Sequence, residues 1–148
     1  MPARDDLHPE DVPGILKHVG LIDVVHRPDR LRFRYRLVGT RMNHVFGQDF
    51  TGTWLHESKH GPYRDFLDAL YAEAVQARRP VYSETSFGYR GDRCLTVKRL
   101  ILPLSSGENH VNMLLFANMF ASNDHDFGFR PYYSTDILGF DELIRSAA

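Results

Sequence analysis

The fold is decided by residues 32–55, RFRYRLVGTRMNHVFGQDFTGTWL. In the first part of this stretch, Phe33, Tyr35 and Leu37 alternate with arginines. Alternation of apolar and charged side chains is typical of a strand that buries one face and exposes the other to water. We therefore expect a half-buried antiparallel strand here, with these three apolar side chains on one face.

A short helix is expected directly after this strand. Gly39 interrupts the strand, and Thr40 is a favourable N-cap for a helix that reaches Phe46. Gly47 suits the left-handed backbone conformation that commonly ends a helix. The Asp-Phe-Thr-Gly sequence at 49–52 offers two side chains that can cap a further turn, so strand, helix and turn form one compact scaffold.

Upstream of this scaffold, the pattern predicts a helix and a hairpin. A short N-terminal helix is expected within residues 8–20, because that segment begins with proline and acidic residues and ends at a glycine. Residues 21–26 are predicted to form the first strand, and the turn at 27–30 joins it to the arginine-rich strand.

Downstream, one long amphipathic helix is expected over residues 61–79. Pro62 suits a first helical turn, apolar residues recur at helical spacing from Tyr63 to Val75, and Pro80 stops the helix. Three strands are predicted after it, at residues 81–89, 93–104 and 111–120, of which the last is the most apolar and is expected at the centre of the sheet.

The chain has two further features beyond these helices and strands. Gly91-Asp92 fits a two-residue hairpin turn between two of the predicted strands. Residues 121–139 are expected to form a loop, and residues 140–146 a final short helix.

Taken together, these motifs resemble the PAS superfamily, and more narrowly a family of short, single-domain bacterial PAS proteins. The resemblance is carried by YRLVGT at 35–40 and GQDFTG at 47–52, and it extends to the later strands that contain PVY at 80–82 and LILPL at 100–104. It implies an α+β fold: a five-stranded antiparallel sheet with flanking helices on one face, plus short N- and C-terminal helices. A cone-shaped α+β isomerase fold agrees less well, because it begins with its helices.

The resemblance implies a single domain over residues 1–148, with a helical flank at 1–20, a PAS core at 21–120 and an extension at 121–148. It also implies a stand-alone sensory or adaptor domain in bacterial signalling, which binds a small molecule, a partner protein or both, and which is not an enzyme. Self-association as a homodimer through the N-terminal flank is a third interpretation. Because PAS domains share a fold and not a ligand, the motifs do not name the ligand.

In such a domain the sheet and the long helix enclose a cavity, and apolar walls with a few convergent polar groups are what a small-molecule site needs. The residues predicted to line it are Tyr35, Leu37, His44, Phe46, Trp54, Phe66, Leu70, Tyr71, Thr85 and Arg99. The alternative is that these side chains simply fill the core.

Among PAS domains, haem-binding relatives place an axial histidine on the long helix, and residues 61–79 contain none. Flavin-binding photosensors use a cysteine on an earlier helix, whereas Cys94 falls in a predicted strand. The resemblance therefore disfavours haem and flavin, and the cofactor remains unknown.

Histidines suggest a different function, a small α+β pocket enzyme or metal-binding protein. His56 and His60 are spaced as in the H-E-x-x-H metal motif, and His44 could serve in acid–base chemistry. That motif needs a continuous helix, whereas Gly61 and Pro62 follow immediately, so we expect a solvated loop and no metal.

Arginines are concentrated around the second predicted strand: Arg27, Arg30, Arg32, Arg34, Arg36 and Arg41. They could form a docking surface for an anionic partner. We favour the alternative of a solvated strand face paired to Asp23 or Glu84.

Composition limits the class of protein. With 148 residues, 43% of them hydrophobic, the chain can bury a core of its own. Its net charge of −1 argues against a nucleic-acid-binding protein. A single cysteine indicates a reducing compartment, and the absence of a signal peptide or long apolar run predicts a cytoplasmic protein without membrane attachment.

Overall fold

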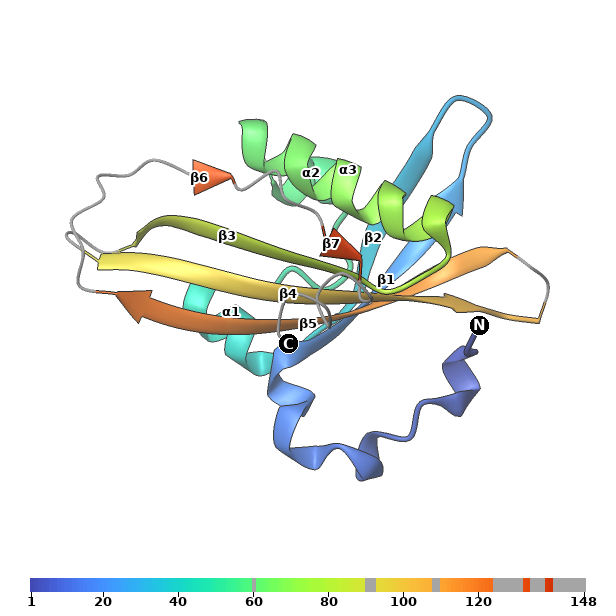
Figure 1. Ribbon diagram of the computed structural model, residues 1–148, viewed down its shortest axis with the longest axis horizontal. Coiled ribbons are helices and arrows are strands. Elements are labelled where there is room, and N and C mark those ends of the chain that lie inside the picture. The colour runs from blue at the N-terminus through green and yellow to red at the C-terminus, as the bar shows by residue number, and fades with distance from the viewer. Residues whose placement is uncertain (60, 90–92, 108–109, 124–131, 134–137, 140–148) are drawn as a thin grey trace.

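The computed structural model shows an antiparallel sheet with a long helix across one face (Figure 1). It describes residues 1–59, 61–89, 93–107, 110–123, 132–133 and 138–139. The five long strands are β1 (Val19–His26), β2 (Leu31–Val38), β3 (Val81–Tyr89), β4 (Arg93–Ser105) and β5 (Val111–Asn123). They lie in the order β2-β1-β5-β4-β3, so the predicted sheet and the central place of the apolar last strand are confirmed.

Two short strands extend the sheet at the edge formed by β3. β6 (Tyr132–Tyr133) and β7 (Leu138–Gly139) both pair with β3, so part of the predicted C-terminal loop adds to the sheet. β5 also continues to Asn123, three residues beyond its predicted end, because β4 provides pairing partners as far as Cys94. The predicted turn at 91–92 and the final helix at 140–146 lie outside the described residues.

Three helices connect β2 to β3: α1 (Thr40–Phe46), α2 (Leu55–Ser58) and α3 (Gly61–Ala77). α3 lies across the sheet, as its apolar stripe predicts, and buries Leu67, Leu70, Tyr71, Ala74 and Val75 in the core. It ends at Ala77 because Arg78 adopts a positive φ of 52°, ahead of Pro80. Within the described residues, no helix combines the length and the apolar character needed to cross a bilayer.

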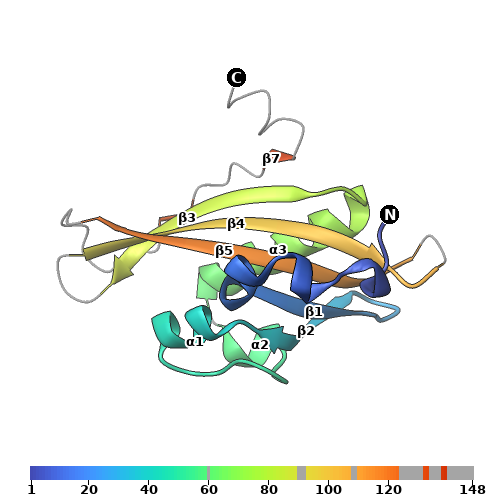
Figure 2. The same ribbon diagram turned by 90° about the horizontal axis from the view of Figure 1, so that it is seen from below.

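The N-terminal segment differs from its prediction. Instead of one α-helix, it forms three 3₁₀ turns, η1 (Arg4–Asp6), η2 (Pro9–Asp11) and η3 (Pro13–His18). Pro9 and Pro13 each begin a new turn, since proline cannot donate the hydrogen bonds of a continuing helix. The segment runs over the face opposite α3 (Figures 1 and 2), where Leu7 packs on a cluster of Leu21, Leu104 and Met113.

Leu37 was predicted to share one face of its strand with Phe33 and Tyr35, and this prediction is wrong because β2 contains a β-bulge. Ile22 pairs with Tyr35 but Leu21 pairs with Leu37, which leaves Arg36 as an extra residue. One extra residue reverses the alternation that follows it. Leu37 is therefore 50% exposed, and Val38 takes the inward position at 7% exposure.

Gly39, not Thr40, is the N-cap of α1, and the helix ends as predicted at Gly47 with φ of 75°. The backbone at Gly39 is in ordinary extended conformation, so the requirement for glycine is one of space. A Cβ at this position would lie 2.4 Å from the carbonyl oxygen of Lys17 and 2.7 Å from that of Val19. Gly39 thus allows η3 to pack against the start of α1.

Substitution of this glycine tests that packing. We expect Gly39→Ala to lower the free energy of unfolding by roughly 2 to 4 kcal/mol, since backbone atoms must move to admit the methyl group. Gly14→Ala is the matched control, because beyond its chain neighbours no atom lies within 4 Å of where the new methyl group would stand. Urea denaturation followed by circular dichroism measures both, and equal stability of the two variants would contradict the close approach.

Candidate functional site

A small cavity lies between the inner face of the sheet, α3 and the segment that carries α1 and α2. Its volume is about 20 Å³, which is room for roughly one water molecule. The residues around it are Tyr35, Val38, Met42, Phe46, Phe50, Lys59, Tyr63, Leu67, Tyr71, Arg99, Phe116 and Asn118. The walls are thus mostly apolar and aromatic, with a few polar groups that converge on one point.

Arg99 of β4 is the most unusual of these groups, because it is only 1% exposed. Its Nη2 donates a hydrogen bond to the Tyr63 hydroxyl at 3.0 Å, and its Nη1 to Ser83 Oγ at 3.4 Å. Within the part of the chain that the structure describes, no carboxylate lies at ion-pair distance from it. A guanidinium buried without an opposite charge is costly, by several kcal/mol.

A second cation, Lys59, lies at the C-terminal end of α2. Its Nζ is 3.3 Å from the centroid of the Phe50 ring and 4.9 Å from that of Phe46, so the ammonium is held by cation–π contacts. Burial lowers the pKa of Lys59 to about 7, and the positive charge of Arg99 adds to this effect. The cavity therefore already contains one fixed charge and a second group that ionises near neutral pH.

Tyrosine hydroxyls complete the polar groups. The hydroxyls of Tyr35 and Tyr71 are hydrogen-bonded to each other at 3.2 Å. Burial raises the pKa of Tyr71 to about 12 and that of Tyr35 well above its usual range, so both stay protonated and can donate. From β5, Asn118 donates to Met42 Sδ at 3.4 Å, while its Oδ1 is buried without a hydrogen-bond partner.

The structure brings together four of the residues predicted to line the cavity: Tyr35, Phe46, Tyr71 and Arg99. Phe66, Leu70 and Thr85 lie in or against the core but not at the cavity, and Thr85 Oγ1 is buried without a partner.

The remaining three predicted residues lie elsewhere. Leu37 is turned outward by the bulge, and His44 is exposed on α1. Trp54 makes an isolated bridge with Arg34 and stacks with Arg32, away from the cavity. A residue on a short helix or after a bulge has no long periodic pattern to predict its direction.

Sequence reasoning missed several lining residues, above all Lys59, Tyr63 and Asn118. Asn118 had a usable signal, since it is a polar residue in the most apolar strand and alternates in phase with Phe116. Tyr63 belongs to the recognised stripe of α3. Lys59 had no signal, because a lysine in a polar connection is ordinarily solvated.

The helix that the H-E-x-x-H motif requires does not continue through residues 56–59. α2 ends at Ser58, and Lys59 is extended with φ of −125° and ψ of 151°. His60 lies outside the described residues. Across the described ranges, no group of three metal-ligating side chains comes together.

A larger groove lies on the surface between the β1–β2 hairpin and helices α2 and α3. Its volume is about 260 Å³, and it is lined by Arg30, Leu31, Arg32, Phe33, Leu55, His56, Arg64, Asp65 and Asp68. Its floor is apolar and its rim carries three arginines against two aspartates. We call this feature the arginine groove.

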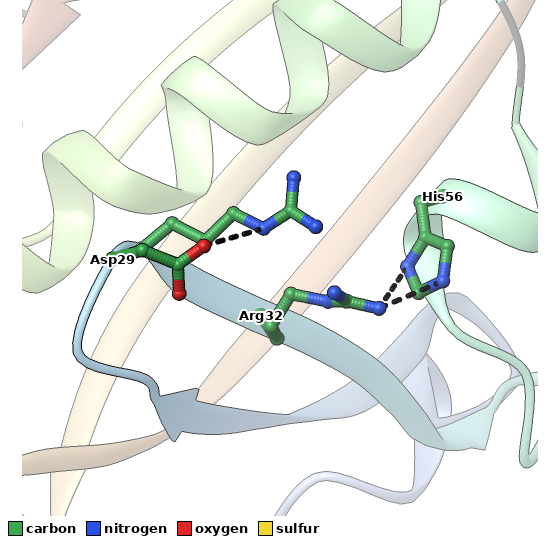
Figure 3. Close-up of polar contacts among 4 residues, drawn as sticks. Asp29, Arg32 and His56 are labelled. Carbon is green, nitrogen blue, oxygen red and sulfur yellow. Dashed lines mark hydrogen bonds and ion pairs between the residues drawn. The ribbon is translucent and has the colours of Figure 1, made fainter.

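Arg32 is the residue of the arginine groove with the most defined position. Figure 3 shows Arg32 and His56 pointing toward each other from β2 and α2, and Arg32 Nη2 lies 2.8 Å from His56 Nε2. The Arg32 guanidinium also lies 5.6 Å from the centroid of the Trp54 ring, and its Nε is buried without a hydrogen-bond partner. By contrast, Arg36 is paired with Asp23 at 2.9 Å, as the solvated-face interpretation predicts.

The ionisation of Lys59 gives a test of the cavity. Because the folded pKa is about 7 and the ordinary value is 10.5, the unfolded chain binds more protons between these limits. Stability from this group therefore rises with pH from 7 to 10.5 and falls by the same amount as pH is lowered. We expect the wild-type free energy of unfolding to increase by about 2 kcal/mol between pH 7.5 and 9.5.

Lys59→Met should abolish this increase and raise stability at pH 7.5, since an apolar side chain of similar length replaces a partly buried amine. Lys98→Met, at an exposed position of β4, is the control and should keep the wild-type pH dependence. Urea denaturation at pH 7.5 and at pH 9.5 measures the change in the free energy of unfolding of each protein. Equal pH profiles for both variants would show that Lys59 is solvated. In the folded protein burial keeps Tyr35 and Tyr71 protonated over this range, whereas in the unfolded chain tyrosines of ordinary pKa begin to ionise near its upper end. This reduces the gain in stability by roughly a few tenths of a kcal/mol, equally in wild type and in both variants.

Comparison with known families agrees with this architecture. The family model for the PAS domain matches residues 1–117, which is most of the chain. A search of curated proteins finds no match. The match supports a sensory or signalling domain in general, and the sheet order with α3 across its inner face is the arrangement that the sequence motifs predict. The chain therefore belongs to the PAS domain family.

Proposed function

We propose that this PAS domain is a sensor that takes a small molecule into the cavity under α3 and passes the signal to a partner protein by contact. The observation that carries the proposal is the convergence of Arg99, Lys59 and the tyrosine hydroxyls inside an otherwise apolar interior. A core that served packing alone would favour apolar side chains there, because buried cations are costly. Such costly groups are concentrated at functional sites.

The cavity must widen to accept a ligand, since it has room for only about one water molecule, at about 20 Å³. Its outer wall is built from short elements, α1 with seven residues and α2 with four. Short helices joined by turns are the elements that open most easily in a folded domain. Their displacement would enlarge the cavity and change the surface at the same time.

We propose no catalytic role for the histidines. His44 is exposed on α1 and does not line the cavity. His56 is exposed and lies against Arg32. Neither ring is placed to act as a general base within the cavity, which supports binding as the function.

The arginine groove favours a second candidate function, that of an adaptor for a partner protein. Its apolar floor and cationic rim complement a peptide that carries an aliphatic side chain between acidic ones. Arg32 is held in place by Trp54 and His56, so little ordering is needed on binding. The exposed apolar side chains of Val12, Ile15 and Leu16 support self-association through the N-terminal segment as a separate contact.

The sensor function is tested by native mass spectrometry of the freshly purified protein and by thermal shift against a panel of metabolites. We expect at least one compound to raise the melting temperature by roughly 5 to 10 °C at 100-fold excess over its Kd. Val38→Leu, which adds a methylene group to the cavity wall, should fold but lose this stabilisation. If the purified protein carries no bound compound and no metabolite stabilises it, the sensor function is contradicted and the adaptor function remains.

The adaptor function is tested with fluorescent peptides that place leucine between glutamates. We expect salt-sensitive binding that Arg32→Ala weakens about tenfold, since a desolvated charge pair contributes more than 1 kcal/mol. Arg41→Ala is the control, as Arg41 is exposed on α1 and does not line the groove. Equal losses in the two variants would indicate nonspecific attraction to positive charge.

A further inference from the structure

The charges around the cavity do not balance. Arg99 contributes a permanent positive charge, and Lys59 contributes a second when protonated. The other polar residues among the described lining residues are Tyr35, Tyr63, Tyr71 and Asn118, and none of them is a residue type that brings a carboxylate. Among the lining residues that the structure describes none is acidic, so these residues give the cavity an excess of positive charge.

The guanidinium of Arg99 is already held in one orientation. Its two described contacts, to the Tyr63 hydroxyl at 3.0 Å and to Ser83 Oγ at 3.4 Å, are with neutral acceptors. A carboxylate adds an opposite charge to these contacts, and its two oxygens can accept two parallel hydrogen bonds from one guanidinium. An anion could therefore displace the weaker of these contacts, and the Tyr63 hydroxyl could turn to donate to it.

We propose that the cavity binds a small organic carboxylate, with the Arg99 guanidinium and the Tyr63 hydroxyl as its anion-binding groups. This inference rests on the sensor function proposed above and names its class of ligand. The remaining walls, which include Val38, Phe50 and Phe116, suit a short aliphatic or aromatic group attached to the carboxylate. A free phosphate would leave that apolar surface uncovered.

Lys59 is the group whose protonation would change when the carboxylate binds. Arg99 from β4 acts on its amine through its positive charge, and the other described titratable residues that line the cavity are Tyr35 from β2 and Tyr63 and Tyr71 from α3. None of these described residues carries a carboxylate. A carboxylate beside Arg99 would favour the protonated amine and raise the pKa of Lys59 from about 7. Binding at pH 8 should therefore take up close to one proton for each ligand bound.

The ammonium of Lys59 lies over the rings of Phe50 and Phe46. Attraction to a carboxylate would draw it from these rings toward Arg99. Because Lys59 directly follows α2, this movement would pull on the helix that also lines the arginine groove.

The test uses isothermal titration calorimetry at pH 8 with straight-chain carboxylates of two to six carbons and benzoate. The matched primary amides and inorganic phosphate are measured in the same way, and buffers of different ionisation enthalpy report the proton uptake. We expect carboxylates to bind at least tenfold more tightly than their amides, with uptake of close to one proton.

Single substitutions test the contribution of each group to carboxylate binding. Arg99→Gln should weaken carboxylate binding about 100-fold, and Tyr63→Phe, which removes only a hydroxyl, about fivefold to tenfold. Tyr63→Phe keeps the test decisive if Arg99→Gln does not fold. Lys59→Met should lose the proton uptake and bind carboxylates about tenfold more weakly at pH 8, since a ligand that raises the pKa of Lys59 gains affinity from the protonation of this amine. Arg36→Gln at the surface should behave as wild type.

Each contrary outcome has its own meaning. Amides that bind as tightly as carboxylates would overturn the anion assignment and leave the sensor function standing. Binding of phosphate without any carboxylate would overturn the carboxylate class. Carboxylate binding without proton uptake would overturn the role of Lys59. If no compound of this titration binds and no compound of the metabolite panel stabilises the protein, both the carboxylate assignment and the proposed sensor function are contradicted.

Discussion

The long antiparallel pairing of β4 with β5 is the constraint on which the inner face of the sheet depends. It runs from Cys94 opposite Asn123 to Ser105 opposite Val111, with one irregularity near its end. This register sets Arg99 directly opposite Asn118, and Ile101 opposite Phe116. Because a shift of one residue would turn all of these side chains to the other face, the same pairing that builds the core also places the polar groups of the cavity.

Two opposing demands meet under α3. The apolar stripe of the helix requires a dry, well-packed inner face, and Leu67, Leu70 and Ala74 provide it. Arg99 brings a charge into that interior, held by the Tyr63 and Ser83 hydroxyls and by no carboxylate among the described residues. The domain tolerates this cost because five paired strands and one long helix supply a large apolar core around a single polar point.

The cavity and the arginine groove are built from the same elements. β2 presents Tyr35 to the cavity and Phe33 to the groove, and α3 likewise contributes Leu67 to one and Asp68 to the other. The closest link is α2, since His56 lines the groove and Lys59, at the end of the same helix, lines the cavity. A change inside the domain therefore has a short and continuous physical route to the surface.

The strands, the long helix and their order along the chain were predicted from sequence alone, because long segments of the chain show a clear pattern. Residues of β2 alternate as far as Tyr35, apolar residues recur at helical spacing from Tyr63 to Val75, and β5 is rich in apolar residues. Glycine at 47 ended α1 as predicted, because few other residues adopt a positive φ without strain. Four of the residues predicted to bind a ligand, Tyr35, Phe46, Tyr71 and Arg99, do lie around the cavity, while ligand binding by them stays a prediction. In these cases the local pattern and the tertiary structure agree.

Tertiary structure alone decided the rest. The bulge at Arg36 depends on how β2 meets β1, so no pattern within β2 could show that Leu37 turns outward and Val38 inward. Pro9 and Pro13 divide the N-terminal segment into short turns, but its place on the outer face of the sheet depends on the packing of Leu7 on Leu21 and Met113, residues far away in the chain. Lys59 and Arg99 lie 40 positions apart in the chain, and only the packing of α3 on β4 and of α2 on β2 and α3 brings the two cations into one cavity. Charge complementarity is a property of neighbours in space, and the sequence shows neighbours only along the chain.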